Sequence, residues 1–289
     1  MRGQNQKTAA YISLITTFVL WGSLYVVSKY VLGKLPTFTI SFLRFGIAFG
    51  ALTLIGRRKK ETIERKDYPW LLLIGVGGYF TAVGAQLLGT KYAGASLASL
   101  LNSLNPVTMT LFAALFLHEK LTAKKAAGLV LALAGVYVIL GGSGGGSMAG
   151  ILLSLAAVLL WSAVSVLMRR VTQKYDSLQV TRWGVGIAAL CYLPVCGAEL
   201  VSGASFALDL PCVLSLLYMG AVCTGIAYFL WNKSLSVLEA GLCSAFYPVQ
   251  PLVSAALGMV LLGERTGIAF WGGAALIVAG ILVNVAGRE

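Results

Sequence analysis

Two apolar stretches carry polar side chains suited to binding a small solute, together with prolines that interrupt a helix. The stretches are "LNSLNPVTMTLFAALFLHE" at 101–119 and "FYPVQPLVSAALGMVLLGE" at 246–264, which share a proline position at an offset of 145 residues. Proline has no N–H, so Pro106 frees the carbonyl of Asn102 and Pro251 frees that of Tyr247. In a membrane such carbonyls need a protein, water or ligand partner. The repeated break predicts a solute site, and two tolerated kinks are the structural alternative.

Each broken stretch has a polar face. At 3.6 residues per turn, the shared-face residues are Ser99, Asn102, Ser103 and Pro106 in one stretch and Ser244, Tyr247, Pro248 and Pro251 in the other. We expect the two faces to meet at the middle of the membrane. There the amide of Asn102 would suit a zwitterion, and Tyr247 would add a ring and a hydroxyl.

Aromatic and amide residues in other spans are further candidates for lining a solute cavity. They are Trp21, Tyr25, Tyr79, Gln86, Trp161, Tyr228 and Trp231. Aromatic rings stack on apolar or cationic groups while their polar edges fix orientation. The alternative for each ring is helix packing, or a place in the interfacial belt near the end of a span.

Two arginines lie inside apolar spans. A charge at the centre of a membrane helix costs roughly 2.5–3.5 kcal/mol on insertion scales. Arg44 and Arg182 are therefore candidates to hold a carboxylate or phosphate of the solute. Alternatively, each reaches the interface or binds backbone carbonyls of neighbouring helices.

Acids, histidine and cysteines do not form a chemical site in this sequence. No Asp or Glu lies deep in a span, and His118 is the single histidine, so an intramembrane proton relay is not expected. Glu119 and Glu264 end the two broken stretches, where we expect them to cap or brace a helix. The five cysteines have no zinc or redox spacing and fit buried apolar positions. We expect no metal and no cofactor.

The elements that position these residues are membrane helices. The chain has 289 residues, of which 58% are hydrophobic and 11% charged, far below the roughly 25% charged residues of soluble domains. Runs of about 20 apolar residues span a bilayer. We identify ten, at about 9–32, 37–56, 70–90, 93–117, 124–140, 148–170, 178–197, 211–231, 240–262 and 267–285. The chain is predicted to be an all-α integral membrane protein.

The formal charge of +12 is explained by orientation. With a cytoplasmic N-terminus, sixteen of the 22 Lys and Arg residues fall in inside segments and four in outside segments. This bias follows the positive-inside rule and predicts that both termini are cytoplasmic. Lys59 and Lys120 should lie inside and Gly144 outside. The charge requires no nucleic acid partner, and the lipid bilayer is the expected surroundings.

The two halves of the chain are similar to each other. "GLVLALAGVYV" at 128–138 matches "GAALIVAGILV" at 273–283, and Trp21 pairs with Trp161 at an offset of 140 and Arg44 with Arg182 at an offset of 138. The predicted domains are 1–140 and 148–289, joined by a Gly/Ser linker at 141–147. Five helices per repeat is an odd number, so the second repeat must be inverted, as in many secondary transporters.

These paired patterns resemble the drug/metabolite transporter (DMT) superfamily in its ten-helix form with two EamA-type repeats. The residues that carry the resemblance are the two tryptophan positions, "SFLRF" around Arg44, "PVTMTLFAALFLHEKL" with its partner "QPLVSAALGMVLLGERT", and the spaced glycines of the fifth and tenth spans. The resemblance covers nearly the whole chain. It implies a multi-pass protein of the inner (plasma) membrane that moves a small metabolite.

The expected function is a secondary transporter that exports an amino acid or a related zwitterionic or neutral solute by alternating access. Within the same fold, the alternative is an organic anion or sugar-phosphate exchanger using Arg44, Arg182 and Lys29. A receptor that binds without transporting is a further alternative. An enzyme is not expected, because there is no buried acid–base pair or metal cluster. Glycines in the fifth and tenth spans let helices approach closely. They fit packing within one chain and packing against a second copy in a homodimer equally well.

Overall fold

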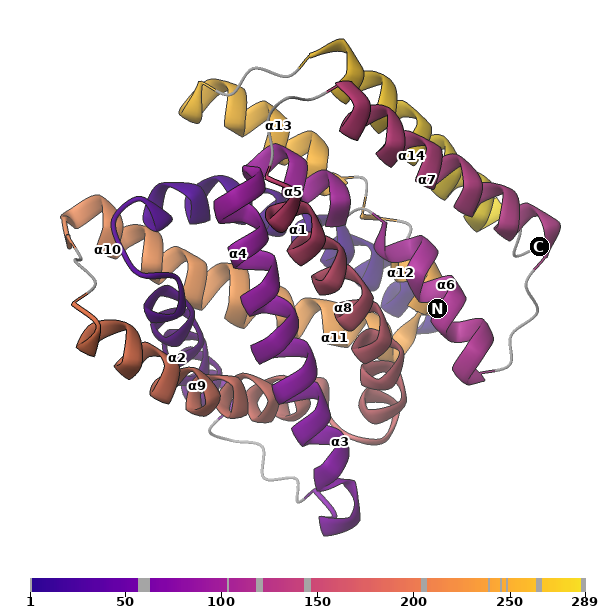
Figure 1. Cartoon of the computed structure of the whole chain (residues 1–289). Helices are drawn as coiled ribbons and strands as arrows, with labels where there is room; N and C mark the ends of the chain where they lie inside the picture. Colours follow the sequence, from indigo (N-terminus) through magenta and orange to yellow (C-terminus); the bar gives the residue numbers. More distant parts are fainter. Residues whose placement is uncertain are drawn as a thin grey trace.

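A computed structural model describes residues 2–56, 63–102, 104–117, 122–142, 147–203, 207–238, 240–244, 246–247, 249–263 and 267–286. Every regular element in these ranges is a helix (Figure 1). Some residues named in sequence predictions lie outside the described ranges: Lys59, Ser103, Glu119, Lys120, Gly144, Pro248 and Glu264.

The helices coincide with the apolar runs of the sequence. The first half contains α1 (Arg2–Leu32), α2 (Thr37–Ile55), η1 (Arg65–Asp67), α3 (Tyr68–Leu73), η2 (Ile74–Ala82), α4 (Val83–Ala93), α5 (Ala95–Asn102), α6 (Asn105–Leu117) and α7 (Ala123–Gly142). The second half contains α8 (Met148–Lys174), α9 (Ser177–Val201), α10 (Leu210–Leu217), η3 (Tyr218–Ile226), α11 (Ala227–Val237), α12 (Ala240–Ser244), α13 (Val249–Leu262) and α14 (Ile268–Ala286). Both halves therefore repeat one order of long and interrupted helices.

Seven of the helical stretches in the described residues are long and apolar enough to cross a bilayer. They are Gln6–Leu32, Thr37–Ile55, Arg65–Ala93, Met148–Lys174, Ser177–Val201, Leu210–Val237 and Leu242–Leu262, and their mean hydropathy lies between 1.6 and 2.4. Helices of this length and composition bury their own backbone hydrogen bonds, which the bilayer requires. The chain is therefore an all-helical protein built for a membrane.

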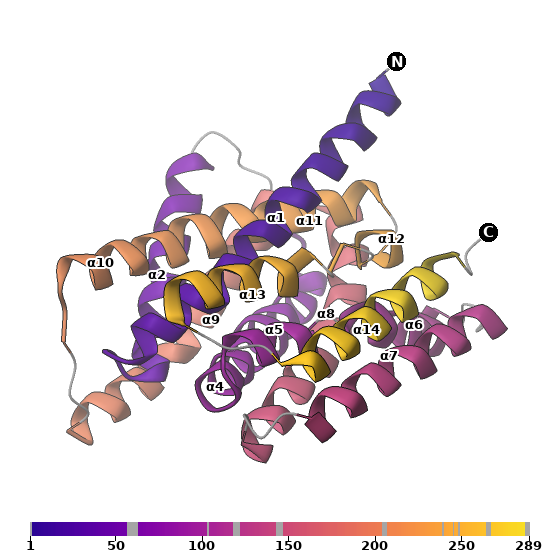
Figure 2. The same ribbon diagram turned by 90° about the horizontal axis from the view of Figure 1, so that it is seen from above.

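The helices form a central group flanked by two pairs. On one side α2 packs against α9, and on the other α7 lies along α14 (Figures 1 and 2). The close approach of the second pair depends on Gly135, since a Cβ there would lie 2.6 Å from the carbonyl oxygen of Gly273. Between the pairs, α1 contacts α11 and α13, while α8 contacts α4, α5 and α6.

The two ends of the central group are fixed by contacts between helix termini. We call the end at which α1 begins the inner end and the end at which it stops the outer end, after the predicted orientation. The Ser234 hydroxyl donates to the carbonyl of Ala10, so α11 stops at the inner end. The amide of Ser147 donates to the carbonyl of Tyr92, and the Lys29 ammonium donates to that of Lys91. Hence α4 stops and α8 begins at the outer end.

Both η2 and η3 are nine-residue π-helices within otherwise α-helical rods. Such wide turns are rare in proteins and frequently mark functional positions. Near its start, each π-helix has a glycine that packs closely against a long helix of the other half. A Cβ at Gly75 would lie 2.6 Å from Ile187 Cβ, and one at Gly220 would lie 2.6 Å from Ile47 Cβ. The two rods are thereby locked against α9 and α2 at matching places.

The prolines of the broken stretches start helices rather than bending them. Pro106 lies in the first turn of α6 and Pro251 in the first turn of α13, where a missing N–H costs no helical hydrogen bond. The freed carbonyls have protein partners. Asn105 Nδ2 donates to the Asn102 carbonyl at 2.6 Å, and the Gln250 amide donates to that of Tyr247 at 3.0 Å.

Candidate functional site

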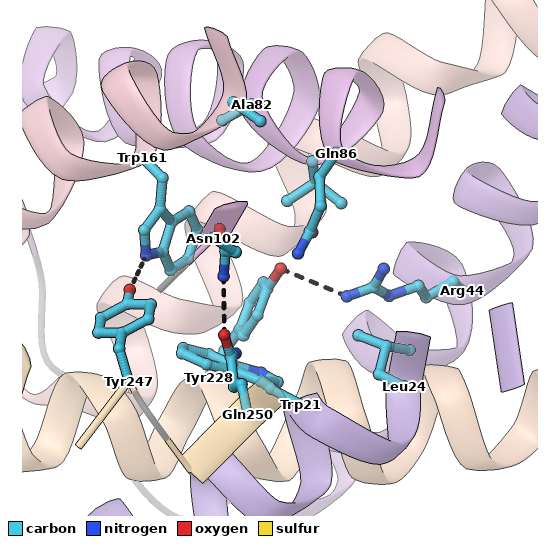
Figure 3. A pocket seen from close by; sticks show the side chains of 12 residues that line it. Trp21, Leu24, Arg44, Ala82, Gln86, Asn102, Trp161, Tyr228, Tyr247 and Gln250 are labelled. Carbon is cyan, nitrogen blue, oxygen red and sulfur yellow. Dashed lines mark hydrogen bonds between the residues drawn. The ribbon is translucent and has the colours of Figure 1, made fainter. Parts of the chain in front are cut away.

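A small cavity lies at the centre of the molecule, between the two broken stretches. Twelve residues line it: Trp21, Leu24, Arg44, Ala82, Val83, Gln86, Asn102, Ala157, Trp161, Tyr228, Tyr247 and Gln250 (Figure 3). Its free volume is about 20 Å³, close to what one water molecule needs. A solute the size of an amino acid would require the surrounding helices to move apart.

An amide pair connects the two breaks across this cavity. Asn102 Nδ2 donates to Gln250 Oε1 at 2.8 Å (Figure 3). Asn105 fixes the orientation of the Asn102 amide, because Asn105 Nδ2 also donates to Asn102 Oδ1 at 2.9 Å. Asn105 Oδ1 in turn accepts from the Ser162 hydroxyl at 2.8 Å. Asn102 is therefore held in a connected network with Asn105 and Ser162, and it presents an amide to the cavity.

Aromatic rings form a further part of the cavity wall. Trp161 Nε1 donates to the Tyr247 hydroxyl at 2.7 Å, and Trp21 Nε1 donates to the Cys223 carbonyl at 3.1 Å. The Trp21 ring lies 5.8 Å from that of Trp161 and 5.6 Å from that of Tyr228, both nearly perpendicular. Perpendicular contacts with satisfied N–H groups hold the rings in fixed orientations. This wall suits an apolar side chain or a cation.

Arg44 brings a positive charge to the cavity wall. Its side chain is only 2% exposed. Nε donates to the Thr224 hydroxyl, and one terminal nitrogen donates to the Tyr228 hydroxyl at 3.4 Å (Figure 3). Among the described residues no carboxylate pairs with Arg44, because Glu64, Asp67, Asp176, Glu199 and Asp209 all lie at helix ends or beyond them. A buried charge without a counter-ion favours an anionic group of the solute as its partner.

A second, smaller cavity continues from the first toward the outer end. It shares Leu24, Arg44 and Gln86 with the central cavity and adds Tyr25, Ser28, Leu87 and Thr90. Gln86 Nε2 donates to the Tyr25 hydroxyl at 2.5 Å. This side-chain hydrogen bond joins α1 to α4 across the outer side of the central cavity.

The structure brings most of the predicted site residues together. Trp21, Arg44, Gln86, Asn102, Trp161, Tyr228 and Tyr247 line the central cavity, and Tyr25 lines its outer extension. Tyr79 and Trp231 lie directly behind the wall. The Tyr79 ring stacks on Tyr228 at 4.7 Å, and the Trp231 ring lies 5.6 Å from Trp21.

Arg182 does not reach either part of the cavity. It is half-buried beside Gly56, at the far end of α2. The glycine contacts explain why its sequence match with Arg44 does not carry over. Gly220 abuts the backbone of Arg44, whereas Gly75 abuts that of Gly184. Gly184 therefore has the place on α9 that Arg44 has on α2.

Some lining residues were not anticipated from the sequence: Leu24, Ala82, Ala157 and Gln250. Gln250 had a recognisable signal, since it is an amide inside the second broken stretch and directly precedes Pro251. The others are apolar residues in apolar helices. Only the three-dimensional packing distinguishes them from lipid-facing neighbours.

Comparisons with known proteins identify the family and the fold of the chain. A model of the EamA-like transporter family matches residues 8–141 and again 148–286. The chain is 32% identical over 287 residues to a probable amino-acid metabolite efflux pump of Salmonella typhimurium, covering 93% of this chain and 92% of the relative. It is 27% identical over 281 residues to an uncharacterized transporter of Archaeoglobus fulgidus, covering 96% and 99%. A crystal structure with 26% identity superposes with a TM-score of 0.73 over 96% of both chains.

Proposed function

Because the chain belongs to the EamA-like transporter family, we propose that it exports an amino acid or a related zwitterionic or neutral solute across the plasma membrane. The resemblance to the DMT superfamily is confirmed, and the protein is a membrane transporter of this type. The solute class is supported by the printed names of relatives in Salmonella typhimurium and Escherichia coli, at 32% and 30% identity.

The observation that carries the proposal is the pairing of Arg44 with an aromatic wall in one closed cavity. The guanidinium would hold the solute carboxylate, with Asn102 and Gln250 offering donors and acceptors beside it. The faces of Trp21 and Trp161 would hold the ammonium or an apolar side chain. Since the cavity has little free volume, loading and release require the outer and inner sides to open in turn.

We further propose ten membrane helices in two inverted repeats, 1–140 and 148–289, joined by the linker at 141–147, with both termini cytoplasmic. The double match to one family model supports this arrangement. So does reciprocal packing, since α1 contacts α11 as α8 contacts α4. Thiol labelling of single cysteines at Lys59 and Gly144 tests it. Labelling from the same side of the membrane would contradict the inverted repeat.

The second candidate function is exchange of an organic anion or sugar phosphate. The position of Arg44 in the cavity wall favours this exchange, because an organic anion or sugar phosphate needs a cation in the cavity. The aromatic wall and the lack of a second cation in the described lining favour an amino acid, which carries one carboxylate and no phosphate.

Flux through purified protein in liposomes separates these functions. We expect vesicles loaded with labelled amino acids to release them faster than protein-free vesicles, with unlabelled amino acids competing. Competition by sugar phosphate or inorganic phosphate alone would establish the exchanger. Thermal stabilisation by amino acids without any flux would establish a receptor.

A further inference from the structure

Unpaired polar atoms gather on the inner side of the central cavity. In the described residues, Ser165 Oγ, Trp231 Nε1 and Asn232 Oδ1 are buried without a hydrogen-bond partner. The side chains of Ser165, Trp231 and Asn232 are completely buried. Two further atoms of this kind belong to Thr53 on α2 and Gln179 near the start of α9. Burying an unpaired polar atom costs folding free energy, so a cluster of them calls for a reason.

Two of these residues, Ser165 and Asn232, belong to one polar layer. Asn232 Nδ2 donates to the Tyr79 hydroxyl at 3.0 Å and to the Thr181 hydroxyl at 2.8 Å. Tyr79 donates to Met168 Sδ at 3.6 Å. Ser165 precedes Met168 by about one turn on the same face of α8. The unpaired oxygens of Ser165 and Asn232 therefore belong to a layer shared by α8, α9, η2 and α11.

A large cavity opens on the inner side of this layer. Its volume is about 630 Å³, and it is lined by parts of α1, α8, α9 and α11. Three lining residues connect it to the polar layer. Ser177 Oγ donates to the Asn232 carbonyl at 3.3 Å, Lys233 follows Asn232 in the chain, and Thr172 lies one turn beyond Met168.

An apolar layer of rings closes the way to the central cavity. Phe18 lies 5.7 Å from Trp231 and 4.6 Å from Tyr247, measured between ring centroids. All three rings are fully buried. The order from the centre to the inner end is therefore central cavity, ring layer, polar layer and open cavity. The outer side differs, because there Tyr25 bonds to Gln86 and packs against Ala95 and Ala98.

We propose that the inner half of the solute route passes between α1, α8 and α11, through the ring layer of Phe18, Trp231 and Tyr247, past Ser165 and Asn232, into the inner cavity. The unpaired oxygens gain water or solute as partners when the rings separate. Their burial raises the free energy of the closed arrangement and so favours opening. The proposal rests on the proposed transport function, and its solute is the same carboxylate-bearing solute.

Thiol labelling tests the route without any solute. The five native cysteines are replaced, and single cysteines are introduced as Ser165→Cys and, on the same helix, Ser154→Cys. Ser154 is a matched control because it is buried, donates to the Gly150 carbonyl at 2.9 Å and lies against Gly89. With a membrane-impermeant maleimide, we expect Ser165→Cys to react from the inner side only and Ser154→Cys from neither side. Reaction of Ser165→Cys from the outer side, or from neither, would overturn the route.

A second measurement covers the case in which the cysteine variant does not fold. Ser165→Ala removes an unpaired oxygen, so the melting temperature should rise by roughly 2 °C or more. The same change removes a group that stabilises the open route, so transport should slow about fivefold. Ser162→Ala is the control, since Ser162 Oγ is bonded to Asn105 Oδ1 at 2.8 Å and its loss should lower the melting temperature. An unchanged transport rate in Ser165→Ala would contradict the proposal.

The two proposals can fail separately. Inner-side labelling of Ser165→Cys without amino-acid flux would keep the route and reject the solute. Amino-acid flux with no labelling would keep the transport function and reject the route.

Discussion

The two halves of the chain match the same family model, yet they contribute different chemistry to the central cavity. The first half supplies the charge and two of the amides, from Arg44, Gln86 and Asn102. The second supplies most of the rings, from Trp161, Tyr228 and Tyr247. The difference matches the solute proposed above, since the first half would hold its carboxylate and the second its apolar or cationic group.

Backbone contacts are matched where side-chain chemistry is not. Gly75 and Gly220 make the same close approach to α9 and α2. At that approach α2 has Arg44, whereas α9 has Gly184, against which the Tyr79 ring packs. The comparison teaches that the two halves share their close glycine packing, while the side chains that they turn toward the cavity differ.

The largest expected effect comes from removing the charge that only the first half supplies. Arg44→Gln should reduce transport by about tenfold to a hundredfold or more, since a hydrogen bond to a charged group contributes about 1.5–3 kcal/mol. Arg44→Lys should not restore it, because an ammonium lacks the planar fork. Arg182→Gln is the matched control, with transport near that of the parent. The measurement is flux in liposomes at equal protein content. Equal losses in Arg44→Gln and Arg182→Gln would contradict the conclusion that only the first half supplies a charge to the cavity.

The next effect concerns the two breaks themselves. Asn102→Ala and Tyr247→Ala should each lower transport by roughly tenfold to a hundredfold while protein levels hold, because each removes a solute contact without altering the helix backbone. Asn102 is bonded to Gln250, so Asn102→Ala and Gln250→Ala should not be additive in a double-mutant cycle. Unchanged dependence on solute concentration in both single variants would mean that the breaks only begin new helices and bind no solute.

A smaller effect, on stability, is expected at the matched glycine contacts of Gly75 and Gly220. Gly75→Ala and Gly220→Ala each place a Cβ 2.6 Å from an isoleucine Cβ, and overpacking of this kind costs about 1–3 kcal/mol. We expect both variants to lose stability by similar amounts. Gly46→Ala is the control, because nothing lies within 4 Å of a Cβ there. Thermal unfolding in detergent measures the three, and a loss at only one of the paired glycines would argue against matched packing.

The smallest effect is a pH dependence at the outer end. Asp209 pairs with Lys34, which holds the pKa of the Asp209 carboxyl below its usual range. A lowered folded-state pKa gives stability that is present above the unfolded pKa of about 3.9 and is lost as the pH falls through the folded value. The melting temperature should therefore fall slightly below about pH 4. Asp209→Asn should weaken this pH dependence. If the melting temperature of the variant falls with pH as in the parent protein, other carboxyls cause the dependence.

The sequence by itself determined that the chain is helical and apolar enough for a membrane, and where the two broken stretches lie. Apolar runs indicate spanning helices directly, because every residue of such a helix must tolerate lipid or a packed neighbour. The prolines and amides within "LNSLNP" and "YPVQP" stood out against that background. For the same reason most aromatic candidates, including Trp21 and Trp161, could be identified in advance.

Only the tertiary structure decided which polar residues share the cavity. Arg44 and Arg182 look equivalent in the sequence, but a shift of two residues relative to the glycine contacts places one in the cavity wall and the other beside Gly56. Helix rotation turns each residue by about 100°, so two residues of offset move a side chain to another face. That rotation is set by close contacts such as Gly220 on Ile47, which no local sequence pattern specifies.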